Sequence, residues 1–187
     1  VGVAISETEG LLKSGSPGRN TVIGFDDAGL GRVAQVFLTG TVTLPSGQLR
    51  VSGLNLSDAP EGGISLYTSA WGDYTRARIL APGERGSEVI VGADGVVTSV
   101  SSTPGSGRLP DGSTSIVARP GANSDALRKV AVGDTVTVAY SLNQEAEDLR
   151  VAVGGQPTDE MPLLVDGRIT TNQSEYNLLR NPRTAVG

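Results

Sequence analysis

The chain has 187 residues, the size of one domain or of one domain with a short extension, and its formal charge is −5. Its 15 cationic residues are spread along the chain and form no basic stripe, which argues against a nucleic-acid partner. The absence of Cys and His excludes disulfides, zinc–thiolate sites, a Ser-His-Asp triad and an imidazole base from the chain, so proton transfer would fall to Asp, Glu, Tyr or Lys.

Gly and Pro, with 26 and 10 residues, punctuate the sequence without a collagen-like period, which is typical of many short strands joined by tight turns. No stretch approaches the about 20 apolar residues of a membrane-spanning helix. Asp26 and Asp27 lack the liganding pattern of a calcium loop, and we expect no metal or other cofactor. The chain starts at Val1 and ends in a strand-like run at 184–187, so we expect it to be part of a longer polypeptide.

Runs that alternate between apolar and polar residues, or that are apolar and β-branched, predict strands through most of the chain. We place them at residues 21–25, 32–44 (one or two strands), 48–56, 64–68, 87–91, 96–101, 113–119, 135–140, 149–154 and 163–165. Gly53 marks an irregularity in the third run, and Asp94-Gly95 between two runs predicts a hairpin.

Helix is scarce in this pattern. Ser124–Val130 predicts one short helix, because Ser124 suits an N-cap and the segment is acidic early and basic late. Residues 173–179 suit either a second short helix or an irregular loop. We therefore predict an α+β fold that is strongly β-dominated, with mixed or antiparallel sheets and one or two short helices, in a single compact unit over 1–187.

Short motifs, each weak alone, occur along the chain in a recognisable order. They are GVAISETEGLLKS at 2–14, Asn55, LYTSAWG at 66–72, VGADGVV at 91–97, LPDG at 109–112, VGDTV at 132–136, VAVGG at 151–155, LLVDG at 163–167 and NPRTAVG at 181–187. In this order they resemble the phosphodiester glycosidase family, which includes the mammalian lysosomal enzyme that removes N-acetylglucosamine from a phosphodiester on mannose. The last three motifs are the most specific of the set.

The resemblance implies the central part of a secreted or envelope-associated bacterial glycoside hydrolase that cleaves sugar–phosphodiester bonds of the N-acetylglucosamine-1-phosphate type. The family's Asn-Gly-Gly-Phe-Phe-like motif, expected before Val1, and its Asp-Gly-Gly-Gly-Ser-like motif, expected after Gly187, are missing from the sequence. Some site residues belong to those segments. We therefore expect the chain alone to be inactive, and to need the missing segments of the same polypeptide to act on a glycan or sugar-phosphate substrate.

The catalytic residues stay unassigned, whereas five residues are candidates for substrate binding. Arg183 is the first choice for a phosphate contact because a guanidinium donates two parallel hydrogen bonds, and Thr184 would add a hydroxyl. A structural ion pair is the alternative for Arg183. Gly154 and Gly155 follow a predicted strand, and would let backbone N–H groups approach an anion or simply form a turn. Asn55 would line the site or cap a loop.

Tyr67 and Trp71 have rings that can stack on a sugar, but a lone Trp in an aromatic-poor chain more often anchors the core. Asp166 in Val-Asp-Gly is typical of a solvated turn. A non-catalytic β-rich module that binds carbohydrate or acts in adhesion explains the punctuated strands and the absence of His equally well. The sequence beyond Gly187 separates the two functions, since an Asp-Gly-Gly-Gly-Ser-like motif there supports the enzyme.

Overall fold

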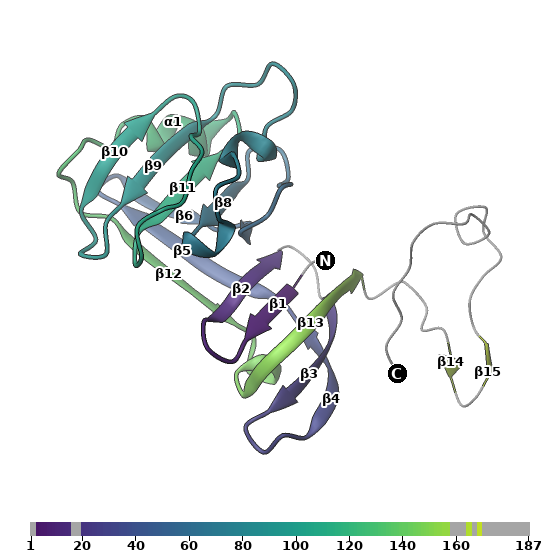
Figure 1. Cartoon of the computed structure of the whole chain (residues 1–187). Coiled ribbons are helices and arrows are strands. Elements are labelled where there is room, and N and C mark those ends of the chain that lie inside the picture. Colours follow the sequence, from purple (N-terminus) through teal and green to yellow (C-terminus); the bar gives the residue numbers. More distant parts are fainter. Residues whose placement is uncertain (1–2, 16–19, 158–163, 166–167, 170–187) are drawn as a thin grey trace.

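The computed structural model describes residues 3–15, 20–157, 164–165 and 168–169 (Figure 1). Its secondary structure is 47% strand and 10% helix, which confirms the predicted β-dominated α+β class. The strands are β1 (Val3–Ser6), β2 (Gly10–Gly15), β3 (Asn20–Asp26), β4 (Gly31–Val36), β5 (Leu38–Leu44), β6 (Gly47–Arg50), β7 (Gly53–Leu54), β8 (Ile64–Tyr67), β9 (Ser87–Val91), β10 (Val97–Ser101), β11 (Thr114–Ala118), β12 (Thr137–Leu142), β13 (Leu149–Pro157), β14 (Leu164–Val165) and β15 (Arg168–Ile169). The helices of the described residues are α1 (Ala122–Leu127) and the short 3-10 helices η1 (Ser69–Trp71), η2 (Arg76–Ile79) and η3 (Gln144–Ala146).

Ten of these strands form one sheet in the order β10-β9-β11-β8-β7-β2-β1-β13-β3-β4. In this sheet β7 and β8 run parallel, and the other neighbouring strands run antiparallel. A second, antiparallel sheet contains β12, β5 and β6, and β14 pairs with β15. The predicted mixed or antiparallel sheets are therefore confirmed. Among the helices of the described segments, none has the length and hydrophobicity that a bilayer crossing requires.

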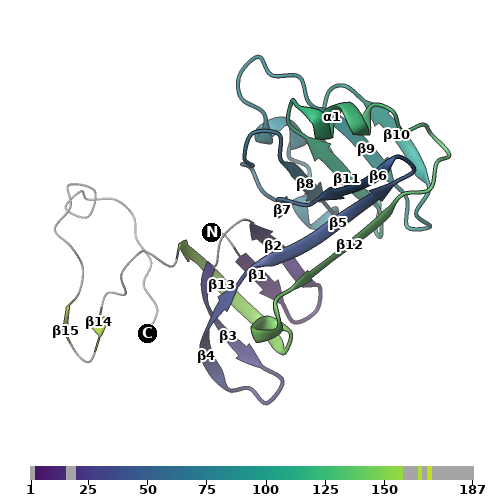
Figure 2. The ribbon, with the colours of Figure 1, turned by 180° about the vertical axis from the view of Figure 1, so that it is seen from behind.

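The ten-stranded sheet runs through two lobes (Figures 1 and 2). One lobe contains α1 and strands β7 to β11, and the other contains β1 to β4 and β13. A buried apolar cluster that includes Leu38, Ile64 and Leu127 fills the first lobe between the two sheets and α1. A second cluster, which includes Val3 and Ala146, packs the other lobe against η3. β5 and β12 lie side by side and extend from the first lobe toward the second.

Most predicted strands are confirmed, and one of the differences has a clear local cause. The run at 32–44 divides at Phe37, which lies between β4 and β5. The Asn143 side chain stabilises this interruption of the strand. It accepts a hydrogen bond from the Phe37 N–H at 2.9 Å and donates one to the Gln35 carbonyl at 2.8 Å. An amide from a distant segment thus replaces the ladder bonds that a continuous strand would make.

The run at 48–56 breaks at Val51-Ser52, so β6 and β7 belong to different sheets. The hairpin predicted at Asp94-Gly95 is confirmed, since β9 pairs antiparallel with β10 and Gly95 has φ of 81°. The last long strand, predicted to end at residue 154, continues to Pro157. Residues 173–179 lie outside the described residues.

The predicted start of the helix at Ser124 is wrong. The helix α1 begins at Ala122, and its N-cap is Gly121, whose φ of 135° favours glycine. Ser124 lies inside the helix and is 1% exposed, with its hydroxyl 2.7 Å from that of Ser87 in β9. The hydroxyl that suits a cap in the sequence instead joins the helix to the sheet.

An ion pair between Arg76 of η2 and Glu88 of β9 lies inside the first lobe, and each residue is only 3% exposed. Arg76 Nε donates to Glu88 Oε1 at 2.5 Å, and the Ser115 hydroxyl donates to the same oxygen at 2.5 Å. The other carboxylate oxygen accepts the Gly105 N–H at 2.7 Å, while Arg76 Nη1 donates to the Gly107 carbonyl at 2.9 Å. Because Glu88 and Arg76 also bond to the backbone of Gly105 and Gly107, the pair holds the loop after β10 against the sheet.

Replacing Glu88 with Ala leaves the Arg76 guanidinium buried without its counter-charge. We expect Glu88→Ala to lower the free energy of unfolding by about 3–5 kcal/mol, measured by urea titration with Trp71 fluorescence. The control is Asp125→Ala, because Asp125 pairs with Arg128 at the surface, where the two side chains are 68% and 45% exposed. This variant should lose less than about 1 kcal/mol. Similar losses in the two variants would show that the buried pair contributes no more to the free energy of unfolding than the surface pair.

Candidate functional site

Asn55 follows β7 and is the residue around which the two lobes meet. Its φ of 51° is in the left-handed region, and it is 3% exposed. The side-chain amide donates to the Leu12 carbonyl at 2.6 Å and to the Thr68 hydroxyl at 3.0 Å, and its oxygen accepts the Thr68 N–H at 3.0 Å. The backbone N–H donates to the Leu66 carbonyl at 2.8 Å. These bonds support the loop-capping alternative for Asn55, whereas a substrate contact stays a prediction.

Gly154 and Gly155 lie within β13, and therefore neither follow a strand nor form a turn. Gly154 stands opposite Val3 on one side and Val22 on the other. A Cβ at Gly154 would come within 2.4 Å of the Thr21 carbonyl oxygen, so the close approach of β3 requires glycine. Gly155 is the extra residue of a β-bulge, since Gly154 pairs with Val22 but Gln156 with Thr21. Strand packing explains Gly154, and the anion contact stays a prediction for both.

Arg183, Thr184 and Asp166 lie outside the described residues. Tyr67 is completely buried, as expected for a core residue, and its hydroxyl donates to the Leu56 carbonyl at 2.7 Å. Burial raises the pKa of this phenol. Trp71 packs edge-on against it with ring centroids 5.0 Å apart, and the indole N–H donates to the Tyr74 carbonyl. Tyr67 is thus closed to a sugar ring.

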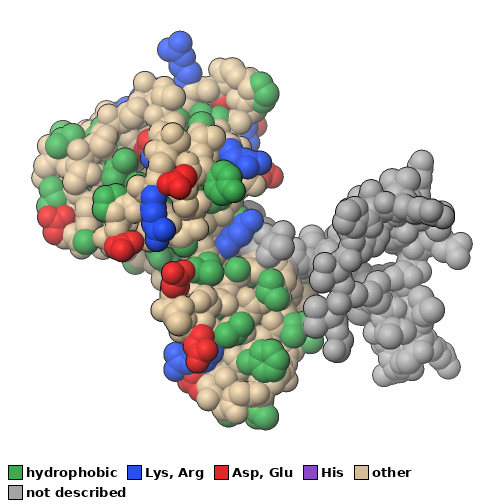
Figure 3. Space-filling model, viewed as in Figure 1, with side chains coloured by type: hydrophobic (Ala, Val, Ile, Leu, Met, Phe, Trp, Pro, Cys, Tyr) green, Lys and Arg blue, Asp and Glu red, His purple; other side chains and the backbone are tan. Residues whose placement is uncertain are grey.

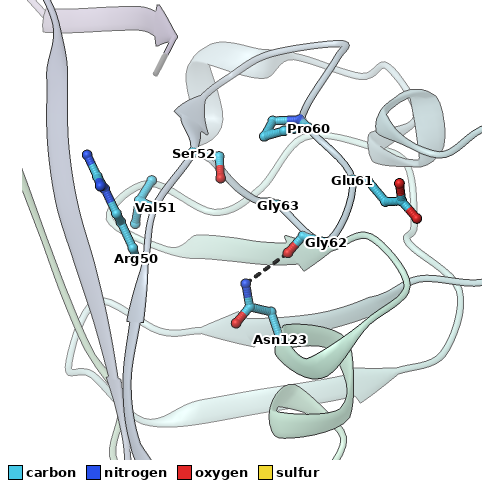
Figure 4. Close-up of a pocket in the computed structure, with 8 residues that line it drawn as sticks. All are labelled: Arg50, Val51, Ser52, Pro60, Glu61, Gly62, Gly63 and Asn123. Carbon is cyan, nitrogen blue, oxygen red and sulfur yellow. Dashed lines mark hydrogen bonds between the residues drawn. The ribbon is translucent and has the colours of Figure 1, made fainter. Parts of the chain in front are cut away.

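The described residues contain a small pocket in the first lobe (Figure 4). Its walls come from the end of β6, the segment before β8 and helix α1, and its volume is about 270 Å³. Arg50 and Glu61 stand on opposite sides of the pocket, with Ser52 and Asn123 between them (Figure 4). Pockets for drug-sized ligands have volumes of about 300–1,000 Å³, and this one lies just below that range.

The loop that forms one wall of the pocket is fixed by hydrogen bonds from its neighbours. Asn123 Nδ2 donates to the Gly62 carbonyl at 2.8 Å, and the Arg119 N–H donates to the Gly63 carbonyl at 3.1 Å. Arg119 Nη1 also donates to the Ala59 carbonyl at 2.9 Å, while its guanidinium pairs with Glu84 at 2.7 Å. This pairing lowers the pKa of the Glu84 carboxyl. The wall is therefore pre-formed before any ligand arrives.

A glycine is needed where this loop passes β7. A Cβ at Gly63 would lie 2.7 Å from the Pro60 carbonyl oxygen and 3.0 Å from the Ser52 hydroxyl. The Ser52 hydroxyl accepts the Ile64 N–H at 3.2 Å, which leaves its own proton for a ligand. The Asn123 amide, once its nitrogen has donated to the loop, keeps its oxygen as an acceptor.

The lining of the pocket combines one guanidinium, one carboxylate, one hydroxyl and one amide side chain. Arg50 is exposed, and no ion-pair partner for it occurs within the segments that the structure describes. A free guanidinium offers planar donors to a phosphate or carboxylate. Ser52, Asn123 and Glu61 add donors and acceptors suited to sugar hydroxyls. Glu61 is the single carboxylate among the eight lining residues.

Sequence reasoning missed this pocket because its walls come from segments far apart in the chain. Arg50 ends one strand, and Asn123 lies within a helix 73 positions later. The signal that the sequence does offer is Pro60-Glu61-Gly62-Gly63, a turn-forming run directly before a strand.

No protein-family model matches the chain, and no curated protein matches it. Its fold is similar to that of a protein from Burkholderia pseudomallei K96243 named "putative exported protein", with a TM-score of 0.61 and 18% identity over 87% of this chain. It is also similar to a hypothetical protein from Synechocystis, with a TM-score of 0.62 and 24% identity over 92% of this chain. The chain spans 38% and 31% of the lengths of those two proteins. At such identities the likeness concerns the fold alone.

The Asn55 side chain can be tested separately from its backbone conformation. Asn55→Ala leaves the Leu12 carbonyl and the Thr68 N–H without a partner, and we expect a loss of about 3 kcal/mol in the free energy of unfolding. Asn55→Gly removes the same bonds but tolerates the left-handed conformation, so it should recover about 1 kcal/mol of that loss. Urea titration of both variants measures the difference. A loss in Asn55→Ala below about 0.5 kcal/mol would show that the side-chain hydrogen bonds of Asn55 do not stabilise the fold.

Proposed function

We propose that this chain is part of an exported glycoside hydrolase that cleaves sugar–phosphodiester bonds, with substrates of the N-acetylglucosamine-1-phosphate type. The observation that carries the proposal is the ordered set of motifs from residue 2 to residue 187, which resembles the phosphodiester glycosidase family over nearly the whole chain. Independent motifs of a general β protein have no reason to keep that order. The three motifs from VAVGG to NPRTAVG contribute most, because they are the most specific.

The pocket supports a ligand of this kind. A sugar phosphate needs a cation for its phosphate and neutral polar groups for its hydroxyls, and the lining of the pocket includes Arg50, Ser52 and Asn123. Asn123 is held by its bond to the Gly62 carbonyl and the Ser52 hydroxyl by the Ile64 N–H, which lowers the entropy that these two groups lose on binding.

Bond cleavage requires more than the pocket holds. Glycosidases of the usual kind use a pair of carboxyl groups, one as the acid and the other as the base or nucleophile. The lining of the pocket includes one, Glu61. We therefore assign binding to the described part of the chain and expect the carboxyl pair to come from other segments of the same polypeptide. Arg183 and Thr184 remain our candidates for a second phosphate contact.

Export to the cell envelope or beyond is part of the same proposal. It is supported by the name of the Burkholderia protein whose fold is similar and by the family that the motifs resemble. The alternative function is a non-catalytic carbohydrate-binding or adhesive module. The single carboxylate of the pocket favours this alternative, because such a module binds a glycan without breaking it.

Binding and turnover test the proposal at separate levels. We expect the chain to bind N-acetylglucosamine-1-phosphate in isothermal titration, and Arg50→Ala to weaken this binding at least tenfold, since a hydrogen bond to a charged group contributes about 1.5–3 kcal/mol. Arg78→Ala, which removes an exposed arginine outside the pocket, is the matched control and should bind normally. Equal affinities in the two variants would exclude the pocket as the phosphate site.

Turnover requires the longer polypeptide. It should release N-acetylglucosamine from a nucleotide-linked donor, and Arg183→Ala should reduce the rate sharply if Arg183 holds the phosphate. Binding by the chain without turnover by the longer polypeptide would favour the carbohydrate-binding module. Full activity of Arg183→Ala would remove that residue from the site.

A further inference from the structure

Three of the seven aromatic residues of the chain lie within eight positions around η1, namely Tyr67, Trp71 and Tyr74. Their rings pack edge-on in series. The centroids of Tyr67 and Trp71 are 5.0 Å apart, and those of Trp71 and Tyr74 are 6.4 Å apart. Tyr67 is completely buried and Trp71 is partly buried, whereas Tyr74 is 68% exposed. The series therefore runs from the core to the surface and ends in an aromatic ring that faces water.

The backbone that carries Tyr74 is fixed by hydrogen bonds on both sides of this residue. The Trp71 indole N–H donates to the Tyr74 carbonyl at 3.1 Å, and the Gly107 N–H donates to the Asp73 carbonyl at 3.2 Å. Arg76, two positions after Tyr74, is anchored to β9 by its buried ion pair. An exposed ring on a fixed backbone loses little conformational freedom when a ligand packs against it.

The angle between the two outer rings favours a sugar over a flat aromatic ligand. The planes of Trp71 and Tyr74 are inclined at 72°, so the two rings form a corner and not a pair of parallel walls between which a base could stack. A pyranose is a thicker ring, with C–H groups on its face and hydroxyls around its rim. Its apolar face can pack against one ring while its rim stays in water. We call Trp71 and Tyr74 the aromatic corner.

Asp73, adjacent to Tyr74, supplies a polar group for the hydroxyls of a sugar. It is exposed, and its Oδ1 accepts the Arg108 N–H at 3.2 Å, which orients the carboxylate. A carboxylate has about four acceptor positions, so Asp73 keeps the capacity to accept a sugar hydroxyl. In Figure 3 acidic and basic side chains intermix across the visible face of the described residues, and this face has no large patch of one charge to attract an ionic ligand.

The aromatic corner is separate from the pocket that contains Arg50. The pocket is lined by Gly63, directly before β8, whereas η1 follows the other end of this strand. β8 has four residues and therefore spans roughly 13 Å. Neither Trp71 nor Tyr74 lines the pocket, so a ligand at the corner leaves the pocket accessible.

We propose that the aromatic corner is a second carbohydrate-binding site, where the face of a neutral pyranose packs against Tyr74 and a sugar hydroxyl donates to Asp73. The inference rests on the proposed function only in that the ligand is a glycan, since the corner requires neither a phosphate nor bond cleavage. A glycan held at the corner has a raised effective concentration near the pocket, so the two sites together bind a longer glycan more tightly than either does alone.

Trp71 is the single Trp of the 187-residue chain, so its fluorescence reports directly on a ligand at the corner. Titration with the trisaccharide of N-acetylglucosamine, which carries no phosphate, should give a saturable change in emission. Tyr74→Ala should weaken this binding at least about tenfold, because it removes the ring against which the sugar packs. Tyr74→Phe retains the ring and should bind normally. Tyr140→Ala is the matched control, since Tyr140 is 38% exposed but lies on β12.

The proposal is overturned if the trisaccharide causes neither a change in emission nor heat in isothermal titration, or if its affinity is the same in Tyr74→Ala as in the unmodified chain. Circular dichroism of each variant checks that it is folded. Should Tyr74→Ala not fold, Asp73→Ala takes its place, and an affinity for the trisaccharide equal to that of the unmodified chain would overturn the contact with Asp73.

A second ligand separates the corner from the pocket. Arg50→Ala should leave the affinity for the trisaccharide unchanged while it weakens the binding of N-acetylglucosamine-1-phosphate. Loss of trisaccharide binding in Arg50→Ala, together with its retention in Tyr74→Ala, would place the glycan in the pocket and overturn the proposal. Failure of the trisaccharide alone leaves the proposed function intact, whereas failure of N-acetylglucosamine-1-phosphate alone contradicts the role of the pocket and leaves the corner supported.

Discussion

The hydrogen bonds of Asn55 are the constraint on which the arrangement of the two lobes depends. Within the ten-stranded sheet, β2 and β7 share only the pairs Ser14–Leu54 and Gly15–Gly53. Asn55 strengthens this narrow seam from the next position, because its amide reaches the Leu12 carbonyl in β2 and both the N–H and the hydroxyl of Thr68 after β8. A left-handed backbone costs free energy at any residue other than glycine. At Asn55 three side-chain hydrogen bonds offset that cost.

The β2–β7 pairing and the hydrogen bonds of Asn55 join two lobes that carry different features. The first lobe holds the pocket of Arg50, Ser52 and Asn123, and the buried pair of Arg76 and Glu88 stiffens its sheet from the other side. The second lobe exposes the side chains of Phe25, Val33, Val151 and Val153.

Local patterns in the sequence were sufficient for the fold class and for most strands, including the Asp94-Gly95 hairpin, because those features depend on neighbouring residues. Such local patterns do not predict contacts between residues that are far apart in the sequence. The sequence gives no sign that Asn143 divides the run at Phe37, that Glu88 is buried with a guanidinium, or that Arg50 and Asn123 share a pocket. The cap assigned to Ser124 failed for the same reason, since its partner Ser87 lies in a distant strand.

Residue-resolved hydrogen exchange under native conditions tests the central claim, that the Asn55 seam makes the two lobes one cooperative unit. The slowest amides of β9 and β11 in the first lobe, and those of β3 and β13 in the second, should then open with the same free energy, equal to that of global unfolding. Opening of the β3 and β13 amides several kcal/mol more easily than those of β9 and β11 would show that the lobes unfold separately, and would contradict the claim.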